Sequence, residues 1–465
     1  MTIEQGAKSV SATDAGWVDE ILLSGPADQL CFALPEPIDR SALRSLVADR
    51  RERLIAAGLR PGGAAALRLP PSIAYVANLL AVWQAGGQAI LLDHRLTDYE
   101  VDRAVKYLNP QVIVAPQRSV GGMRIFHEVT DAATGYGDQP AGTHHAVVQL
   151  SSGSTGPSKV IGRTAADLIE EIRRYTQIDG VALPGERIIL LPSMVHVLGL
   201  VGGLLYGLHA GVTLVPPERL TGDSILAAIQ SAQSPATVLG VPFHIGLLSS
   251  TVIDRRPAQL RRMVTGGELV PAATAARFVD KYQVPLGNMY GMTEVGVIGT
   301  DLFGSHRPSV RPAPGIDIRS QDGELWIARP ESPYLGAAVP ERWANGWLRT
   351  KDAGVLDSGT GLVTILGRLD SQVTIGGLQV DLAEVEATLG ALSGVVAAVV
   401  LFDEGIVAYL QLEAGYQAAD VEARLAVQLA PYKRPRAFVV LEEMPRTTTG
   451  KLVRDRSALR AASSS

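Results

Sequence analysis

Short apolar runs that alternate with helix-like segments constrain the fold of this chain more than any other feature. In the first part of the sequence the strand-like runs are residues 64–69, 89–92 and 112–115, and the helix-like segments between them are 73–84 and 98–108. Strands that alternate with helices in this way form parallel sheets whose faces the helices cover. The pattern therefore predicts an α/β fold.

The alternation resumes after a Gly/Ser-rich loop and later changes character. Further strand-like runs occur at 188–191, 212–215, 237–240 and 263–265. Short runs with glycine turns then predict a β-rich subdomain over 317–367, and the rest of the chain mixes strands with helices. We expect a large N-terminal domain of layered sheets flanked by helices over residues 1–369, and a small α+β C-terminal domain over residues 370–465.

The composition favours a globular enzyme and argues against several other classes. Hydrophobic residues make up 46% and charged residues 19% of the 465 residues, which is enough apolar material for substantial cores. The formal net charge is −5 and no basic block occurs, so we expect no nucleic-acid partner. The single cysteine, Cys31, excludes an intrachain disulfide. No apolar run reaches the length of a membrane span, and we expect a cytoplasmic protein.

Residues 149–159, with the sequence QLSSGSTGPSK, form a Gly/Ser-rich loop after the apolar run 146–150. Glycines let the backbone approach an anion closely, hydroxyl and N–H groups donate to its oxygens, and Lys159 adds positive charge. Such a loop predicts a phosphate site, although the same composition also suits a flexible linker. The spacing GxxxxGK[ST] of a Walker A loop is absent. The loop alone leaves both alternatives open.

Four further stretches place functional residue types at expected turns. They are NMYGMTE at 288–294, TKD at 350–352, GRLDSQV at 367–373 and PRTTTGK at 445–451. Each is weak evidence alone, because ordinary loops and linkers have similar compositions. Together with the Gly/Ser loop, and in this order, they resemble the signature motifs of the adenylate-forming superfamily, which includes acyl- and aryl-CoA synthetases, adenylation domains of peptide synthetases and luciferases. The resemblance covers the chain from about residue 58 to residue 459.

The resemblance implies an enzyme that uses ATP and Mg²⁺ to convert a carboxylic acid into an acyl adenylate. Such a site must hold a polyphosphate and place the carboxylate in line with the α-phosphorus of ATP. By resemblance, Thr293 contacts the α-phosphate and Glu294 binds Mg²⁺. Tyr290 packs on the adenine, and Asp352 binds the ribose hydroxyls close to Arg368. The other nucleotide-binding residues implied by the motifs are Ser151, Ser152, Gly153, Ser154, Thr155, Gly156, Lys159, Gly266, Gly267, Glu268 and Gly291.

The resemblance also implies a second half-reaction at the same site. Lys451 matches a lysine that bridges the carboxylate and the α-phosphate. Asp370 matches the hinge about which the small domain rotates after adenylation. Gly376 and Gly377 then offer a narrow backbone path for a pantetheine arm. The acceptor is therefore the thiol of CoA or of phosphopantetheine on an acyl carrier protein.

The pocket for the acid is predicted from the segment LPSMVHVLG at 191–199. It resembles the Pro-x-x-x-His stretch of acyl- and aryl-acid activators, in which His196 either contacts the substrate or is structural. Amino-acid adenylation domains carry an aspartate at the position of Val197, so an α-ammonium there would be left unpaired at high cost. We expect an aryl or medium aliphatic acid. The remaining pocket residues that we expect are Gly199 and Gly203, which open space on the next helix, and the apolar walls Val295 and Val297.

The sequence departs from the family pattern in places, and more than one function stays open. The phosphate loop and the usual Thr-Gly-Asp motif differ from the family pattern, the latter being Thr350-Lys351-Asp352 here, but Lys159 and the carboxylate are kept. The leading function is an acid–thiol ligase. A second uses an amine or other nitrogen acceptor, as in an amide synthetase or a diazotase-like enzyme. A third is a non-catalytic nucleotide-binding relative, which the retained Glu294 and Lys451 disfavour.

Overall fold

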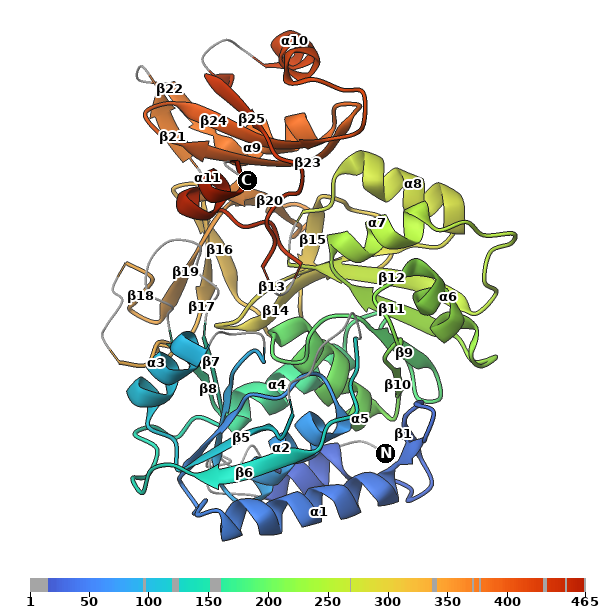
Figure 1. Ribbon diagram of the computed structural model, residues 1–465, viewed down its shortest axis with the longest axis vertical. Helices are drawn as coiled ribbons and strands as arrows, with labels where there is room; N and C mark the ends of the chain where they lie inside the picture. Colours follow the sequence, from blue (N-terminus) through green and yellow to red (C-terminus); the bar gives the residue numbers. More distant parts are fainter. Residues whose placement is uncertain are drawn as a thin grey trace.

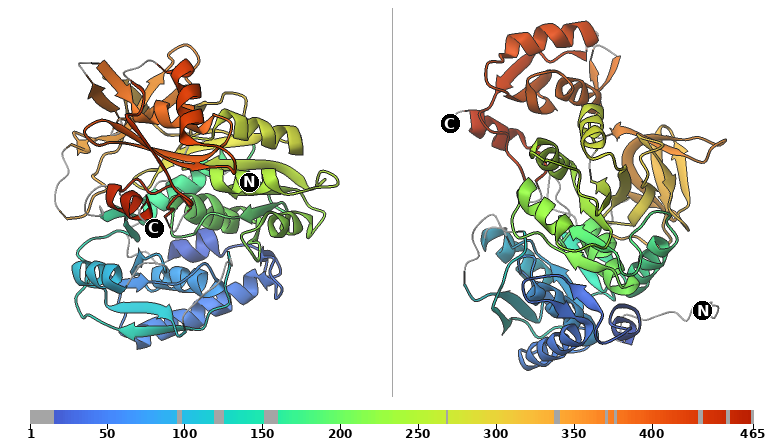
Figure 2. Two further views of the ribbon diagram at one scale, coloured as in Figure 1. Left: turned by 45° about the horizontal axis from the view of Figure 1, so that its top comes forward. Right: turned by 90° about the vertical axis from the view of Figure 1, so that its right-hand side faces the viewer.

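The structure is a computed structural model, and it describes residues 16–94, 98–118, 125–150, 160–267, 269–336, 341–369, 372–375, 378–429, 433–447 and 450–463. Figures 1 and 2 show a large lower part with two layers of sheet and helix, and a small upper part formed by the C-terminal segment. The layered α/β architecture agrees with the fold class predicted from the sequence.

The N-terminal alternation forms the first sheet, in the strand order β6-β5-β3-β4-β7-β8. The inner strands pair in parallel, whereas β5–β6 and β7–β8 are antiparallel. Helix α2 packs on β3 and β4 and is covered in turn by α1, so it is buried all round. The elements are η1 (Val18–Leu22), α1 (Arg40–Ala56), β3 (Ala64–Leu67), α2 (Ile73–Gln84), β4 (Gln88–Leu91), α3 (Asp98–Leu108), β5 (Val112–Pro116), β6 (Asp131–Gly135), β7 (Val147–Leu150) and β8 (Val160–Arg163).

The parallel part of the second sheet runs in the order β13-β12-β11-β9-β10-β1, with β2 antiparallel at its edge. Successive strand residues face two different cores, because side chains alternate across a sheet. One core lies under α4, η2 and α5, and the other under α6, α7 and α8. The elements are β1 (Leu30–Phe32), β2 (Ile38–Asp39), α4 (Ala165–Thr176), β9 (Arg187–Leu190), η2 (Leu198–Leu205), α5 (Tyr206–Ala210), β10 (Thr213–Val215), α6 (Gly222–Gln230), β11 (Ala236–Gly240), α7 (Pro242–Ser250), β12 (Leu260–Gly266), α8 (Ala272–Tyr282) and β13 (Leu286–Met292).

The β-rich region continues this second sheet instead of forming a separate one. Strand β13 pairs antiparallel with β14, and the order runs on through β15, β20, β19 and β17 to β16. This continuity places β19 and β20 close to the end of β13. The strands are β14 (Gly296–Asp301), β15 (Ser309–Pro312), β16 (Ile318–Gln321), β17 (Glu324–Ala328), β18 (Trp343–Ala344), β19 (Trp347–Leu356) and β20 (Val363–Arg368).

The C-terminal segment forms a small α+β part with its own apolar cores. Two short sheets, β21-β22 and β23-β24-β25, carry its helices. No helix among the residues described here is long and apolar enough to cross a membrane. The elements are β21 (Gln372–Ile375), β22 (Leu378–Asp381), α9 (Leu382–Gly390), β23 (Val395–Phe402), β24 (Ile406–Leu412), α10 (Ala418–Gln428), β25 (Ala437–Val440) and α11 (Arg456–Ser463).

Candidate active site

Several predicted residues gather at the carboxyl ends of β12 and β13. Gly266 is the last residue of β12, and Tyr290 and Gly291 lie near the end of β13. The turn from β13 to β14 carries Thr293 and Glu294. Ligands of open α/β sheets bind beyond the carboxyl ends of parallel strands, so this edge is the candidate active site.

A short hydrogen bond joins two predicted nucleotide-binding residues from different strands. The hydroxyl of Tyr290 donates to Oδ2 of Asp352 at 2.5 Å. Asp352 is buried, and it lies opposite Arg368 in the pairing of β19 with β20. A carboxylate fixed beside an aromatic ring suits a ribose whose base packs on that ring. The structure thus brings Tyr290 and Asp352 together, and the backbone of Arg368 beside them.

Lys351, which precedes Asp352, has a left-handed backbone with φ of 61°. Glycine is the residue that adopts this conformation without steric cost. Glu324 offsets the strain, because its carboxylate accepts a hydrogen bond from the Lys351 N–H at 3.0 Å and lies 3.8 Å from Nζ. The departure from Thr-Gly-Asp therefore has a local compensation.

Glu294 is buried in a polar cluster whose other members no sequence motif indicated. The hydroxyl of Tyr334 donates to Oε1 of Glu294 at 2.9 Å, and Nη2 of Arg342 lies 3.7 Å from the same oxygen. Nε of Arg342 also donates to the Tyr334 hydroxyl at 3.3 Å. Burial, and then the charge of Glu294, raises the pKa of Tyr334, so the hydroxyl remains a donor. Tyr334 and Arg342 lie in no motif, which is why the sequence did not reveal them.

The carboxylate of Glu294 fits the chemistry of a magnesium site that is completed by substrate phosphates. Magnesium takes oxygen ligands and is usually held by one or two carboxylates together with phosphates and water. In the described parts of the chain, no cluster of three or more His, Cys, Asp and Glu could hold a metal by itself. Glu294 would therefore supply one protein ligand.

A buried ion pair supports the turn after Glu294 from behind. The side chains of Arg163 and Glu171 are 1% and 0% exposed, and Nη2 lies 2.5 Å from Oε2. The other Glu171 oxygen accepts from the N–H of Val297 at 2.9 Å. Gly296 has φ of 90°, and a Cβ built there would lie 2.2 Å from the Glu171 carboxyl carbon. Glu171 therefore fixes the backbone that follows Glu294.

Lys451 reaches this site from the C-terminal part. A Cβ built on Gly267 would lie 3.6 Å from both Cε and Nζ of Lys451. The loop that carries the lysine rests on α7, because the guanidinium of Arg446 lies 5.5 Å from the Phe243 ring and Gly450 approaches the same ring. Figure 1 shows this red segment running down from the small part toward β13. Phe243 is another residue that no motif indicated.

The predicted acid pocket is only partly supported. His196 lies just before η2, where its carbonyl accepts a hydrogen bond from the N–H of Leu200, and Val197 packs against the core under η2. Val297 packs into the core under η2, whereas Val295 packs into the core of the β-rich strands.

The glycines of η2 require a correction, because their space is filled. A Cβ on Gly199 would lie 2.3 Å from the Ser193 carbonyl oxygen, and one on Gly203 would lie 2.4 Å from a Leu190 methyl carbon. These glycines let η2 pack closely on the chain before it and do not open space for a ligand.

Other predicted residues lie outside the described part of the chain. The strand residues that flank the Gly/Ser loop, Leu150 and Val160, are paired across β7 and β8, so the loop starts and ends at one point of the first sheet. The side chain of Arg368 is likewise not described. The predicted residues outside the described ranges are Ser151, Ser152, Gly153, Ser154, Thr155, Gly156, Lys159, Glu268, Asp370, Gly376 and Gly377.

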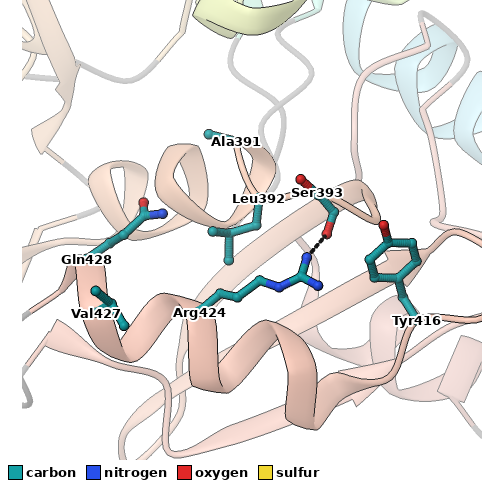
Figure 3. A pocket seen from close by; sticks show the side chains of 7 residues that line it. All are labelled: Ala391, Leu392, Ser393, Tyr416, Arg424, Val427 and Gln428. Atoms are coloured by element: carbon teal, nitrogen blue, oxygen red, sulfur yellow. Dashed lines mark hydrogen bonds between the residues drawn. The ribbon is translucent and has the colours of Figure 1, made fainter.

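A cavity also lies away from this site, on the small part between the chain that follows α9 and helix α10. It has a volume of about 540 Å³. Figure 3 shows Arg424 among the residues that line it, and Nη1 of Arg424 donates to the Ser393 carbonyl oxygen at 2.9 Å. Arg424 is the charged residue of its lining, and no group suited to adenylation is present, so we assign it no role in the reaction.

The fold is layered α/β, and its candidate site combines a strand edge of the large part with a lysine from the C-terminal part. The chain belongs to the AMP-binding enzyme family, whose family model matches residues 43–331. The model of the AMP-binding enzyme C-terminal domain matches residues 384–451. The family resemblance drawn from the motifs is thereby confirmed.

Relatives and solved structures agree with this assignment. The p-hydroxybenzoic acid–AMP ligase FadD22 of Mycobacterium tuberculosis is 26% identical over 97% of this chain and 68% of its own length. Benzoate–CoA ligase of Thauera aromatica is 28% identical over 67% of this chain and 65% of its own length. The ATP-bound crystal structure of MatB from Rhodopseudomonas palustris has a TM-score of 0.83 at 21% identity and covers 97% of this chain and 99% of that one. The chain thus spans about two thirds of the length of these two curated relatives. The comparisons confirm the predicted fold class and support the class of AMP-forming acid ligases.

Proposed function

We propose that this chain converts an aryl or medium aliphatic acid into its acyl adenylate at the expense of ATP and then transfers the acyl group to a phosphopantetheine thiol. The thiol belongs to CoA or to an acyl carrier protein. The position of Lys451 carries this proposal, because its Nζ lies against Gly267 at the strand edge that also presents the Tyr290–Asp352 pair.

In the first half-reaction a carboxylate oxygen of the acid attacks the α-phosphorus of ATP. The bond from that phosphorus to the bridging oxygen breaks, and pyrophosphate leaves. Lys451 would lie between carboxylate and α-phosphate and offset their repulsion. Thr293 would donate its hydroxyl to the α-phosphate, and Asp352 would accept from the ribose hydroxyls. A magnesium ion at Glu294 would neutralise phosphate charge.

In the second half-reaction the thiol sulfur attacks the acyl carbon of the adenylate. The thiol proton passes to solvent, the bond from the acyl carbon to the phosphate oxygen breaks, and AMP leaves. The thiol needs the space that Lys451 occupies, so residues 370–465 would rotate about Asp370 against residues 1–369. Gly376 and Gly377 would then line the path of the pantetheine arm.

An aryl acid is the substrate class best supported. Val197 offers no anionic partner for an α-ammonium group, and an unpaired ammonium on an apolar wall is costly. Two relatives are named for benzoic or p-hydroxybenzoic acid.

Pyrophosphate exchange tests the first half-reaction over a panel of aryl, aliphatic and amino acids. Exchange with aryl acids is expected, whereas exchange with α-amino acids alone would contradict the proposed pocket. CoA, a phosphopantetheinyl carrier protein and amines are then compared as acceptors. Transfer to an amine alone would favour an amide synthetase or diazotase-like enzyme. Nucleotide binding without exchange would favour a non-catalytic relative.

A further inference from the structure

Tyr334 connects the first sheet to the turn between β13 and β14. Its backbone forms an antiparallel bridge with Ile161 in β8. The N–H of Leu335 donates to the carbonyl of Val160 at 2.9 Å. Residues 333–335 therefore pair along the outer edge of β8.

This pairing holds the chain at the point where it leaves the Gly/Ser loop. Val160 is the first residue of β8 and directly follows the loop at 149–159. It is paired with Leu150 of β7 on one side and bonded to Leu335 on the other. The exit of the loop is thus held from both sides.

The side chain of Tyr334 reaches from this edge to the carboxylate of Glu294. Its hydroxyl donates to Oε1 of Glu294 at 2.9 Å, and Nε of Arg342 donates to the same hydroxyl at 3.3 Å. Because the Arg342 N–H points at the tyrosine oxygen, the tyrosine proton is directed to the carboxylate. Nη2 of Arg342 lies 3.7 Å from the same Oε1. One oxygen of Glu294 is therefore oriented by protein groups.

A second link joins the other end of β8 to the same turn. Arg163, the last residue of β8, pairs with Glu171, and the other oxygen of Glu171 accepts from the Val297 N–H. The two links hold β8 against the turn at both of its ends. Of the two, the link through Tyr334 is the one that contacts Glu294 itself.

We propose that Tyr334 is a positioning residue for the metal, which orients the Glu294 carboxylate and keeps it in register with the exit of the Gly/Ser loop. Carboxylates that bind metals are themselves oriented by hydrogen bonds, and loss of such a partner lowers metal affinity about tenfold to a hundredfold. A phosphate chain that contacts both the loop and the metal would then find the two in a fixed relation. The inference rests on the proposed use of ATP and adds a residue that acts through Glu294.

Tyr334→Phe, which keeps the ring and removes the hydroxyl, tests the inference by calorimetric titration. The Mg²⁺ concentration that gives half-maximal ATP binding should rise about tenfold to a hundredfold in this variant. The Kd for AMP, which carries no pyrophosphate and is measured without metal, should stay unchanged. Tyr282→Phe is the matched control, because the Tyr282 hydroxyl in α8 is likewise buried and donates to the Leu248 carbonyl at 2.8 Å.

The outcomes separate this inference from the proposed function. An unchanged Mg²⁺ requirement in Tyr334→Phe would overturn the inference, and so would the same rise in Tyr282→Phe. Equal weakening of ATP and AMP binding, or a variant that no longer folds, would also overturn it, since either result indicates a structural role. All these results leave acid activation intact. The absence of pyrophosphate exchange with every acid of the panel in the wild-type enzyme would overturn the proposed function, whereas the Mg²⁺ dependence of ATP binding would still decide the role of Tyr334.

Discussion

The two halves of the candidate site are held in very different ways. On the large part, Tyr290, Asp352 and Glu294 are fixed by hydrogen bonds between strands or within a buried cluster. On the small part, the loop of Lys451 is held by its own bonds, such as the Lys451 N–H to Oγ1 of Thr447 at 3.2 Å, and it meets the large part at Gly267 and Phe243 through packing. The groups proposed to bind the nucleotide are therefore held by hydrogen bonds within the large part, whereas the described contacts of Lys451 and Arg446 with the large part are packing contacts.

Removal of the positive charge of Lys451 should have the largest effect on activity. We expect Lys451→Ala to lower the pyrophosphate exchange rate by about a thousandfold, or ~4 kcal/mol, because one preorganised charge at a reacting phosphate has this magnitude. Thioester formation from a supplied acyl adenylate should be kept. Lys106→Ala, on the exposed side of α3, is the control. Equal loss of both half-reactions would contradict a role limited to adenylation.

Disruption of the Arg163–Glu171 ion pair, which supports the turn after Glu294, should destabilise the large part. Glu171→Gln keeps an acceptor for the Val297 N–H but leaves Arg163 buried without a charged partner, so the free energy of unfolding should fall by about 3 kcal/mol. Urea unfolding measures this change. The double variant Glu171→Gln/Arg163→Met should recover most of the stability. If the single variant is as stable as the wild type, the pair does not hold this turn.

Residues that lie within one motif could be predicted, and their distant partners could not. Tyr290, Glu294 and Asp352 belong to short recognisable stretches. Their supports, such as Tyr334 and Glu171, depend on the register of strands and helices far apart in the chain, which no local pattern encodes.

The glycines of η2 show a related limit of sequence reasoning. A glycine in a sequence shows that a side chain is missing, but it does not show what occupies the space beside it. Beside Gly203 that space is filled by Leu190, and beside Gly199 by the Ser193 carbonyl. The β-α alternation predicted the layers because hydrophobic periodicity is a local signal. It did not predict that the β-rich strands extend the second sheet.

The stability of the protein should depend on pH through His244, which lies in α7, the helix on which the Lys451 loop rests. Burial lowers the pKa of His244 to about 4, and its Nδ1 accepts from the Val241 N–H at 3.0 Å. The unfolded chain protonates this histidine near pH 6.5 and therefore binds more protons between pH 6.5 and 4. Stability should fall by up to about 3 kcal/mol as pH decreases through this window.

Urea unfolding at several pH values checks this expectation. His244→Asn, which offers an uncharged acceptor in a similar place, should flatten the dependence between pH 6.5 and 4. An unchanged slope in that variant would assign the dependence to other groups.

Weakening the contact between the Lys451 loop and Phe243 of α7 should slow adenylation and leave thioester formation unchanged. Phe243→Leu removes the ring beneath Arg446 and should slow pyrophosphate exchange up to about tenfold, since a cation–π contact is worth about 0.5–2 kcal/mol. Transfer from a supplied adenylate should stay unchanged. Phe303→Leu is a matched control, because the Arg262 guanidinium lies 4.5 Å from the Phe303 ring in a similar contact outside α7. A similar loss of pyrophosphate exchange in both variants would show that the Phe243 contact has no specific role in placing the Lys451 loop.

Relief of the backbone strain at Lys351 should have the smallest effect on the free energy of unfolding. Lys351→Gly removes a side chain from a left-handed position, which costs an L-residue about 1 kcal/mol, but it also removes the weak contact of Nζ with Glu324 and adds freedom to the unfolded chain. The free energy of unfolding should therefore rise by less than about 1 kcal/mol, and the KM for ATP should stay unchanged because the Lys351 N–H still donates to Glu324. A loss of stability would mean that the lysine side chain supports β19 more than its backbone strains it. An altered KM for ATP would mean that the strain itself positions Asp352.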